Sequence, residues 1–420
     1  MFVPTSPEAE DAAGSLVRSV PLHRNRKFML LFTGSTLSVF GNCFHSIALN
    51  LWVLQTTGSA AKMSLITVTH MIASLLLGSF AGTIADRLNR RLLMMICDSS
   101  RFLIVSGIAL VMAHLDQPFM WIVALSALSA VAGLLQSPSS QASITDLVGR
   151  DRVQQAAGLM NIADNAARIS GLAIGGYIVA QFGGVIAIVT DAILFGLSAL
   201  LVFAAGTFPQ AERAQTEQNS FRQDWLEGIK RVWADPFARG VTFLTTFVIL
   251  FFVANLMLIQ VMAVKVWQAS PIHFGLIEAA IPLGYAIGAV TIMGLSKSPR
   301  RRGHLILGSM LAMGPLYIAI AMMPQAAAAI PLILVVGTFF SFCTLLVNVI
   351  MRVEVPSELQ GRMFGILGSL TSVAPPLGLT IMAAMADGFG ASNVLLFSGV
   401  GLIAVASAAW LWLKPIRRYQ

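Results

Sequence analysis

Charged side chains are scarce in this chain of 420 residues. They make up 11% of it, whereas hydrophobic residues make up 56%. A soluble globular protein has roughly 25% charged residues, so this composition excludes an ordinary water-soluble fold. A membrane crossing takes roughly 20 apolar residues, and the length therefore leaves room for about twelve crossings and no large soluble domain.

Cysteine and the signatures of enzymes are equally sparse. The three cysteines, Cys43, Cys97 and Cys343, lie in apolar runs without the spacing of metal ligands, so we expect no disulfide framework and no metal site. No G-x-x-x-x-G-K-[ST] phosphate loop occurs, which argues against ATP as an energy source within this chain. Because no catalytic triad is recognisable either, we expect no catalytic residues, no cofactor and no enzyme activity.

Basic residues outnumber acidic ones and give a formal net charge of +8. They form short clusters between apolar runs rather than one patch, so we expect no nucleic-acid partner. The first 27 residues lack the apolar core and small-residue cleavage site of a signal peptide, and we interpret them as a cytoplasmic tail.

Long apolar runs alternate with short polar connections and predict twelve membrane-spanning helices. The first six are expected at 28–54, 63–85, 92–114, 118–140, 154–181 and 184–206. The other six are expected at 238–264, 271–295, 303–323, 327–350, 362–386 and 391–413. We therefore expect an all-α membrane protein with six-helix halves at 28–206 and 238–413, a central loop at 207–237, and tails at 1–27 and 414–420.

The distribution of lysine and arginine predicts the orientation, because positively charged loops are retained in the cytoplasm. Every second connection and both tails contain basic residues, whereas the intervening connections contain only Lys62 and Lys265. We expect a multi-pass protein of a bacterial inner or plasma membrane with both termini and the central loop in the cytoplasm.

The second half repeats the pattern of the first at an offset of 212 residues, which aligns T-D-L-V-G-R at 145–150 with S-E-L-Q-G-R at 357–362. The same offset aligns Gly82 with Gly294 and Arg90 with Arg302, in two other connections. Two six-helix halves related in parallel are one of the repeat architectures of secondary transporters, with a substrate site between them near the midplane.

The connection after the second predicted helix reads G-T-I-A-D-R-L-N-R-R from Gly82 to Arg91 and resembles the loop signature of the major facilitator superfamily, G-x-L-a-D-R-x-G-R-[RK]. Asn89 stands at the second glycine, and asparagine tolerates the left-handed backbone that glycine would supply, so the turn is compatible with this sequence. The resemblance implies a latch that holds an outward-facing state; the alternative is a solvated turn that only obeys the charge rule. The latch residues would be Gly82, Asp86, Arg87, Arg90, Arg91, Gly361 and Arg362.

A second segment, R-I-S-G-L-A-I-G-G at 168–176, resembles the antiporter motif of the fifth helix, G-x-x-x-G-P-x-x-G-G. It matches in Gly171, Gly175 and Gly176, and Leu172 stands at the proline. With the turn T-G-S at 57–59, it is similar to the branch that includes macrolide exporters and enterobactin-type siderophore exporters. The resemblance implies export, whereas small residues can also serve only to let helices approach closely.

Ionisable groups at membrane depth are costly and usually face a partner or an aqueous cavity. Asn161, Asp164, Asn165 and Arg168 have helical spacing and should share one face of the fifth span. Asp164 would take up a proton while Arg168 sets its affinity; the alternative is a permanent ion pair between them.

Other polar groups interrupt the remaining apolar runs. We expect Asp191 and Glu278 to serve either as proton-coupling groups or in hydrogen bonds between helices. Asn42 and His45 are candidates for the substrate cavity or for hydrogen-bonded packing. Asp98 and Arg101, three residues apart, are more consistent with a structural pair.

Our leading hypothesis is a proton-coupled antiporter that exports a small amphiphilic molecule by alternating access. The expected partners are that molecule, protons and the lipid bilayer, with the protein as a monomer. A macrolide-like drug and a siderophore or metallophore both fit the residues. The alternatives are an ion-coupled importer of a small nutrient and, more distantly, a non-transporting membrane receptor.

Overall fold

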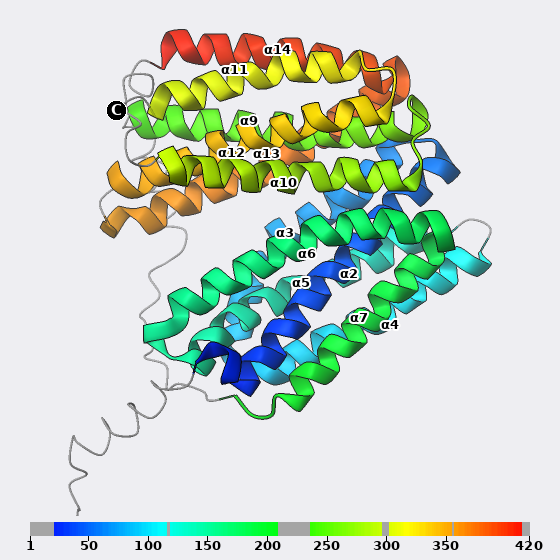
Figure 1. Ribbon diagram of the computed structural model, residues 1–420, viewed down its shortest axis with the longest axis vertical. Helices are drawn as coiled ribbons and strands as arrows, with labels where there is room; N and C mark the ends of the chain where they lie inside the picture. The colour runs from blue at the N-terminus through cyan, green and yellow to red at the C-terminus, as the bar shows by residue number, and fades with distance from the viewer. Residues whose placement is uncertain (1–20, 116–117, 209–235, 296–301, 355–356, 414–420) are drawn as a thin grey trace, which may run out of the picture. The chain divides into compact units, whose positions relative to one another are not determined.

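The computed structural model describes residues 21–115, 118–208, 236–295, 302–354 and 357–413, and every regular element among them is a helix (Figure 1). The elements are η1 (Leu22–Arg24), α2 (Arg26–Thr57), α3 (Ala60–Arg87), α4 (Arg90–His114), α5 (Phe119–Val148), η2 (Arg150–Arg152), α6 (Val153–Phe182), α7 (Gly184–Ala204), α9 (Pro236–Lys265), α10 (Pro271–Leu295), α11 (Arg302–Ala321), α12 (Ala326–Glu354), α13 (Ser357–Phe389) and α14 (Ala391–Trp412). Tails 1–20 and 414–420, and most of the central loop, lie outside the described residues.

Each predicted span corresponds to one long α-helix, so the expectation of a twelve-helix membrane protein is confirmed. Within the described residues, 11 helices are long and apolar enough to cross a membrane. The other long helix is α6, whose 30 residues include Asp164 and Arg168. A helix of that length reaches across the hydrocarbon core, and its polar residues need partners or water there.

The end of α5 lies beyond the predicted boundary at residue 140, because the polar residues of its last turns remain helical. Ser139 and Ser143 donate to the carbonyls of Leu135 and Ser139, at 3.1 and 2.7 Å. A serine bonded to its own helix in this way needs no solvent. The helix ends at Val148, and its C-cap is Gly149, whose φ of 77° favours a residue without a β-carbon.

Two asparagines begin helices in the first half. Asn25 Oδ1 accepts from the backbone N–H of Phe28 at 3.2 Å at the start of α2. Asn89 Oδ1 accepts from Leu92 N–H at 3.2 Å at the start of α4. Asn89 does not use the left-handed backbone that asparagine tolerates, because its φ is −64° and its ψ is 112°. An N-cap needs this extended backbone, so asparagine is used here for its side chain.

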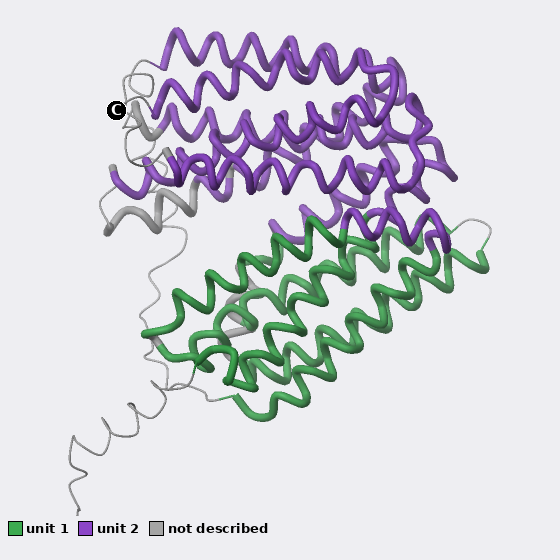
Figure 2. Tube along the Cα trace, viewed as in Figure 1, with its two compact units in different colours: residues 1–46, 76–171, 185–214 green, residues 47–75, 172–184, 215–420 purple. Residues whose placement is uncertain are grey.

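Unit 1 consists of Met1–Ser46, Leu76–Gly171 and Val185–Ala214, drawn in green in Figure 2. Within it α4 packs along α5. An apolar cluster buries one end of the helices and contains Leu22, Phe28, Leu31, Met94, Ile144, Leu147, Val148, Ala156, Met160 and Val202. Asn25 Nδ2 adds a bond of 2.9 Å to the carbonyl of Leu147, so the start of α2 is tied to the end of α5.

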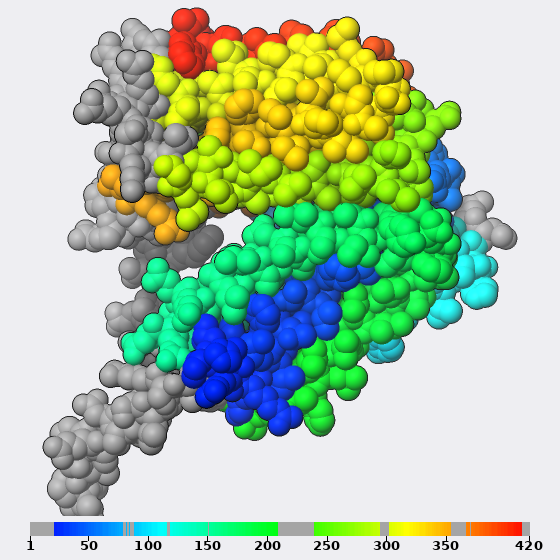
Figure 3. All heavy atoms as spheres, viewed as in Figure 1, coloured from blue at the N-terminus to red at the C-terminus, as the bar shows by residue number. Residues whose placement is uncertain are grey.

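Unit 2 consists of Ile47–Leu75, Leu172–Gly184 and Gln215–Gln420, drawn in purple in Figure 2. It therefore combines the helices of the second half with the end of α2, the start of α3 and the end of α6. Within it α10 packs on α12 and α11 packs on α14. On the face drawn in Figure 3, the atoms of α10, α11 and α12 form a continuous surface. A β-carbon on Gly399 would lie 2.9 Å from the carbonyl oxygen of Gly314, so α14 and α11 meet backbone to backbone.

Candidate functional site

A buried polar network links α4, α5 and α7 inside unit 1. Asp98 of α4 is 0% exposed and accepts hydrogen bonds from Gln136 Nε2 at 2.5 Å and Ser198 Oγ at 2.8 Å. Gln136 also accepts from Arg101 Nη1, at 3.4 Å. The two charged groups expected to form a structural pair are therefore joined through Gln136. A buried network of this kind is stable only when each member keeps its partners.

Arg101 extends the same network to α2. Its Nη2 donates to Asn42 Oδ1 at 2.6 Å, and its Nε lies 3.5 Å from Ser129 Oγ. Its guanidinium stands 3.8 Å from the centroid of the Phe195 ring, an attractive cation–π arrangement. Asn42 was a candidate for the substrate cavity. In the structure it accepts a hydrogen bond from the buried Arg101 guanidinium and so helps to hold that group in position.

His45 and Asp191 form the second polar pair of unit 1. His45 Nδ1 lies 3.3 Å from Asp191 Oδ2, and the two side chains are 18% and 1% exposed. Apart from this ion-pair contact, both Asp191 oxygens are without a hydrogen-bond partner among the described residues. A β-carbon on Gly41 would lie 2.5 Å from Asp191 Oδ1, so the carboxylate occupies space that only glycine leaves free.

The pair and the network act on each other electrostatically. Asp191 and Asp98 are the two carboxylates whose charges act on Arg101. Among the described residues these two buried carboxylates share the Arg101 cation, and Asp191 also has the His45 imidazole 3.3 Å away.

The polar stripe of α6 lies on the surface of unit 1. Asn161, Asn165 and Arg168 are exposed, and Asp164 is half-buried. Each asparagine donates only to the carbonyl four residues earlier, to Ala157 at 2.9 Å and to Asn161 at 2.8 Å. Asp164 and Arg168 are not joined by an ion pair within the described part of the chain, and Asp164 Oδ1 has no hydrogen-bond partner there. The stripe therefore has free donors and acceptors.

Unit 2 contains a buried carboxyl group of its own. Glu278 of α10 is 9% exposed and accepts from Gln260 Nε2 of α9 at 2.7 Å. Elsewhere in the unit, Ser398 of α14 donates to Asn255 Oδ1 of α9 at 2.6 Å. Glu278 is thus engaged in a hydrogen bond between α10 and α9.

Comparison with known proteins identifies the family. The model of the Major Facilitator Superfamily matches residues 31–370. The chain belongs to the Major Facilitator Superfamily. Macrolide efflux protein A of Streptococcus pyogenes is 22% identical over 386 residues, which span 90% of this chain and 94% of that protein. The multidrug efflux pump Tap of Mycobacterium tuberculosis is 26% identical over 403 residues, spanning 92% and 93% of the two chains.

Solved structures show the same fold. A bacterial homologue of the lysosomal transporter Spinster, described as inward-facing and occupied, has a TM-score of 0.75 at 14% identity and covers 95% of this chain and 98% of its own. A bacterial homologue of ferroportin in an inward-facing state has a TM-score of 0.69 at 14% identity, covering 93% and 99%. The protein is therefore a multi-pass membrane transporter of this superfamily and not an enzyme.

The superfamily loop at 82–91 is anchored to unit 1 through two of its arginines. Arg90 forms an ion pair with Asp146 of α5. Arg91 donates to the carbonyls of Val202 at 3.3 Å and Phe203 at 2.7 Å, in the last turn of α7, where a cation is favoured. The side chains of the other latch candidates, Gly82, Asp86, Arg87, Gly361 and Arg362, lie outside the described residues.

The glycines of the antiporter-type motif lie at two close helix contacts. A β-carbon on Gly171 would be 3.1 Å from the carbonyl oxygen of Phe40, within unit 1. A β-carbon on Gly176 would be 2.5 Å from the carbonyl oxygen of Pro271, within unit 2. Gly175 is buried as well. Close approach of the backbone thus accounts for these small residues in physical terms.

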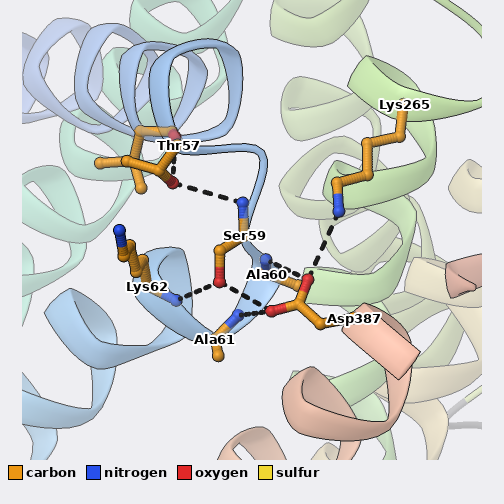
Figure 4. Close-up of polar contacts among 8 residues, drawn as sticks. Thr57, Ser59, Ala60, Ala61, Lys62, Lys265 and Asp387 are labelled. Carbon is orange, nitrogen blue, oxygen red and sulfur yellow. Dashed lines mark hydrogen bonds and ion pairs between the residues drawn. The ribbon is translucent and has the colours of Figure 1, made fainter.

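Sequence reasoning missed several members of these sites. Gln136 and Gln260 are amide side chains within apolar runs, and that contrast was the available signal. Asp387 was also missed, although it accepts three hydrogen bonds from the turn at 59–61 and contacts Lys265 (Figure 4). Its partners in that turn are more than 300 residues away along the chain and Lys265 is 122 away, so no local pattern indicates the contact.

Proposed function

We propose that this transporter exports a small amphiphilic compound in exchange for protons, by alternating access between halves 28–206 and 238–413. The observation that supports it best is the pair of His45 and Asp191, 3.3 Å apart, with the carboxylate 1% exposed. An ionisable group buried at membrane depth is a functional candidate by default, and the charge of Asp191 acts on Arg101 of α4. Export is supported by efflux relatives that span 90% and 92% of this chain.

The free polar groups of α6 are the proposed contacts for the exported compound. Asn161, Asn165 and Arg168 are exposed in unit 1 and bond only within their helix or not at all among the described residues. One cation among amides suits an amphiphile with an anionic or carbonyl-rich head. A macrolide is the first compound to test, and an iron-chelating siderophore is the second.

The proposed topology has both termini and the central loop in the cytoplasm, and the working unit is a monomer. Support comes from the basic residues, which avoid every second connection apart from Lys62 and Lys265. A cysteine-reactive, membrane-impermeant label should react from outside with a cysteine at 62 and not with one at 151. Reaction from outside at 151 alone would contradict this orientation.

Inverted membrane vesicles test the proposed reaction. An inside-acid gradient should drive uptake of a labelled macrolide or siderophore, and an uncoupler should abolish it. Asp191→Asn should also abolish gradient-driven uptake, whereas Asp151→Asn, which removes a carboxylate from η2 outside the long helices, should leave it unchanged. Uptake that survives the uncoupler would refute proton coupling. Symport would instead appear as uptake into right-side-out vesicles under an inward proton gradient.

A further inference from the structure

Asp387, near the end of α13, binds the first turn of α3 (Figure 4). Its Oδ1 accepts from the backbone N–H of Ala60 at 2.8 Å, and its Oδ2 accepts from the N–H of Ala61 at 3.0 Å and from Ser59 Oγ at 2.7 Å. Lys265, the last residue of α9, contributes a longer contact of 3.4 Å. All four partners lie within unit 2.

The turn before α3 is shaped to receive a carboxylate. Gly58 has a φ of 62°, which turns the chain sharply, and Thr57 Oγ1 accepts from Ser59 N–H at 3.3 Å. Ser59 Oγ also accepts from Lys62 N–H at 3.2 Å. The first N–H groups of a helix have no partner within the helix and bear partial positive charge. A carboxylate placed there forms short, charge-assisted bonds.

The hydrogen bonds from the backbone N–H groups of α3, rather than the ion pair with Lys265, supply most of the stabilisation at Asp387. Asp387 and Lys265 are 29% and 34% exposed, and an ion pair with that much solvent contributes little. The bonds to Ala60 and Ala61 approach ideal length and hold a charged acceptor. Loss of the Asp387 charge should therefore weaken the contact far more than loss of the Lys265 charge.

The contact joins helices from opposite halves of the sequence. α3 belongs to the first half and begins at Ala60, whereas α13 belongs to the second half and ends at Phe389. On the proposed topology both points lie at the extracellular side. Alternating access requires that contacts between halves at one side break before that side opens. A bond between these two helix ends is therefore specific to the state that is closed to the outside.

We propose that Asp387 is an extracellular latch: by capping the N-terminus of α3 it holds the transporter closed to the outside until the halves part. The proposal rests on the alternating-access function proposed above. Asp86 lies in the last turn of α3 in the same way that Asp387 lies in the last turn of α13. The extracellular contact is thus the counterpart, at the other side, of the latch expected from the superfamily loop.

Labelling from outside measures how often the closed side opens. Leu172, 7% exposed, is replaced by cysteine in a chain whose native cysteines are alanine, and an impermeant maleimide is added to intact cells. With Asp387→Asn the labelling rate should rise roughly tenfold, as expected for loss of bonds to a charged group. Ser59→Ala should raise it by roughly threefold and Lys265→Gln by less than about twofold.

Ser270→Ala is the matched control. Ser270 Oγ accepts from His273 N–H at 3.4 Å at the start of α10, so its loss also removes an N-terminal cap. That hydrogen bond lies within the start of α10 and does not join α10 to another helix. It should leave labelling at the unsubstituted rate. A rise equal to that of Asp387→Asn would show that helix capping alone matters and would overturn the latch.

Hydrogen exchange of the Ala60 and Ala61 amides provides a second measurement on the otherwise unaltered chain. Asp387→Asn should accelerate their exchange together with labelling. Faster exchange at an unchanged labelling rate would make Asp387 a cap without a gating role and would overturn the proposal. Neither measurement needs substrate or a proton gradient, so the latch can fail or succeed independently of the proposed transport reaction.

Discussion

Gly176 of α6 and Gly275 of α10 meet so closely that a β-carbon on Gly176 would lie 3.0 Å from the Cα of Gly275. The two glycines come from different halves of the sequence and lie together in unit 2. No side chain separates the helices at this point, so their distance is set by backbone contact. Such contacts are a common means of holding membrane helices together.

Gly176→Ala should disrupt this contact. The added methyl group would lie 2.5 Å from the carbonyl oxygen of Pro271, which is backbone and cannot rotate away. The helices must separate, and overpacking of this kind costs about 1–3 kcal/mol, so we expect export to fall about tenfold. Gly158→Ala, on the same helix with nothing within 4 Å of its β-carbon, should retain full export and equal thermal stability. Equal export by both variants would contradict the role assigned to Gly176.

Replacement of His45 should impair gradient-driven export rather than abolish binding. His45→Gln keeps a polar group near Asp191 but removes the imidazole that lies 3.3 Å from the carboxylate. We expect gradient-driven export to fall by roughly tenfold, because the buried carboxylate loses this contact. Binding of the unlabelled compound, measured by calorimetry, should change less than about fivefold. An unchanged rate of gradient-driven export would exclude His45 from the coupling pair.

The network around Asp98 should stabilise the fold of unit 1. Asp98→Ala leaves Gln136 and Ser198 without their acceptor and removes one of the two carboxylates whose charges act on Arg101. We expect a loss of about 1–3 kcal/mol, visible as a lower unfolding temperature of the detergent-solubilised protein. Gln136→Leu alone should destabilise it as well, and the double variant should lose less than the two single losses together because the groups are partners. Strict additivity would show that Asp98 and Gln136 act independently.

The long hydrophobic runs and the polar connections between them predicted much of this fold, because a membrane helix satisfies its backbone within one continuous segment. Every predicted span became one helix, and the largest discrepancies in length arose where polar turns continued a helix, as at Ser143 in α5. Pairings between helices were not predictable. Whether Asp191 faces His45 or Arg101 faces Asn42 depends on helix rotation, which a single sequence with little periodic contrast does not specify.

Asp86→Asn tests whether the loop at 82–91 and the Asp387 contact shift the equilibrium between the two transport states in opposite directions. Loss of the acid at the end of α3 should weaken the state that is open to the outside, so labelling of a cysteine at 172 should fall by roughly the factor by which Asp387→Asn raises it. The two changes act on opposite sides of one equilibrium, and their free energies should therefore add with opposite signs. The double variant should label at close to the unsubstituted rate. If it labels as fast as Asp387→Asn alone, Asp86 does not bias this equilibrium and the loop at 82–91 only orients the chain in the membrane.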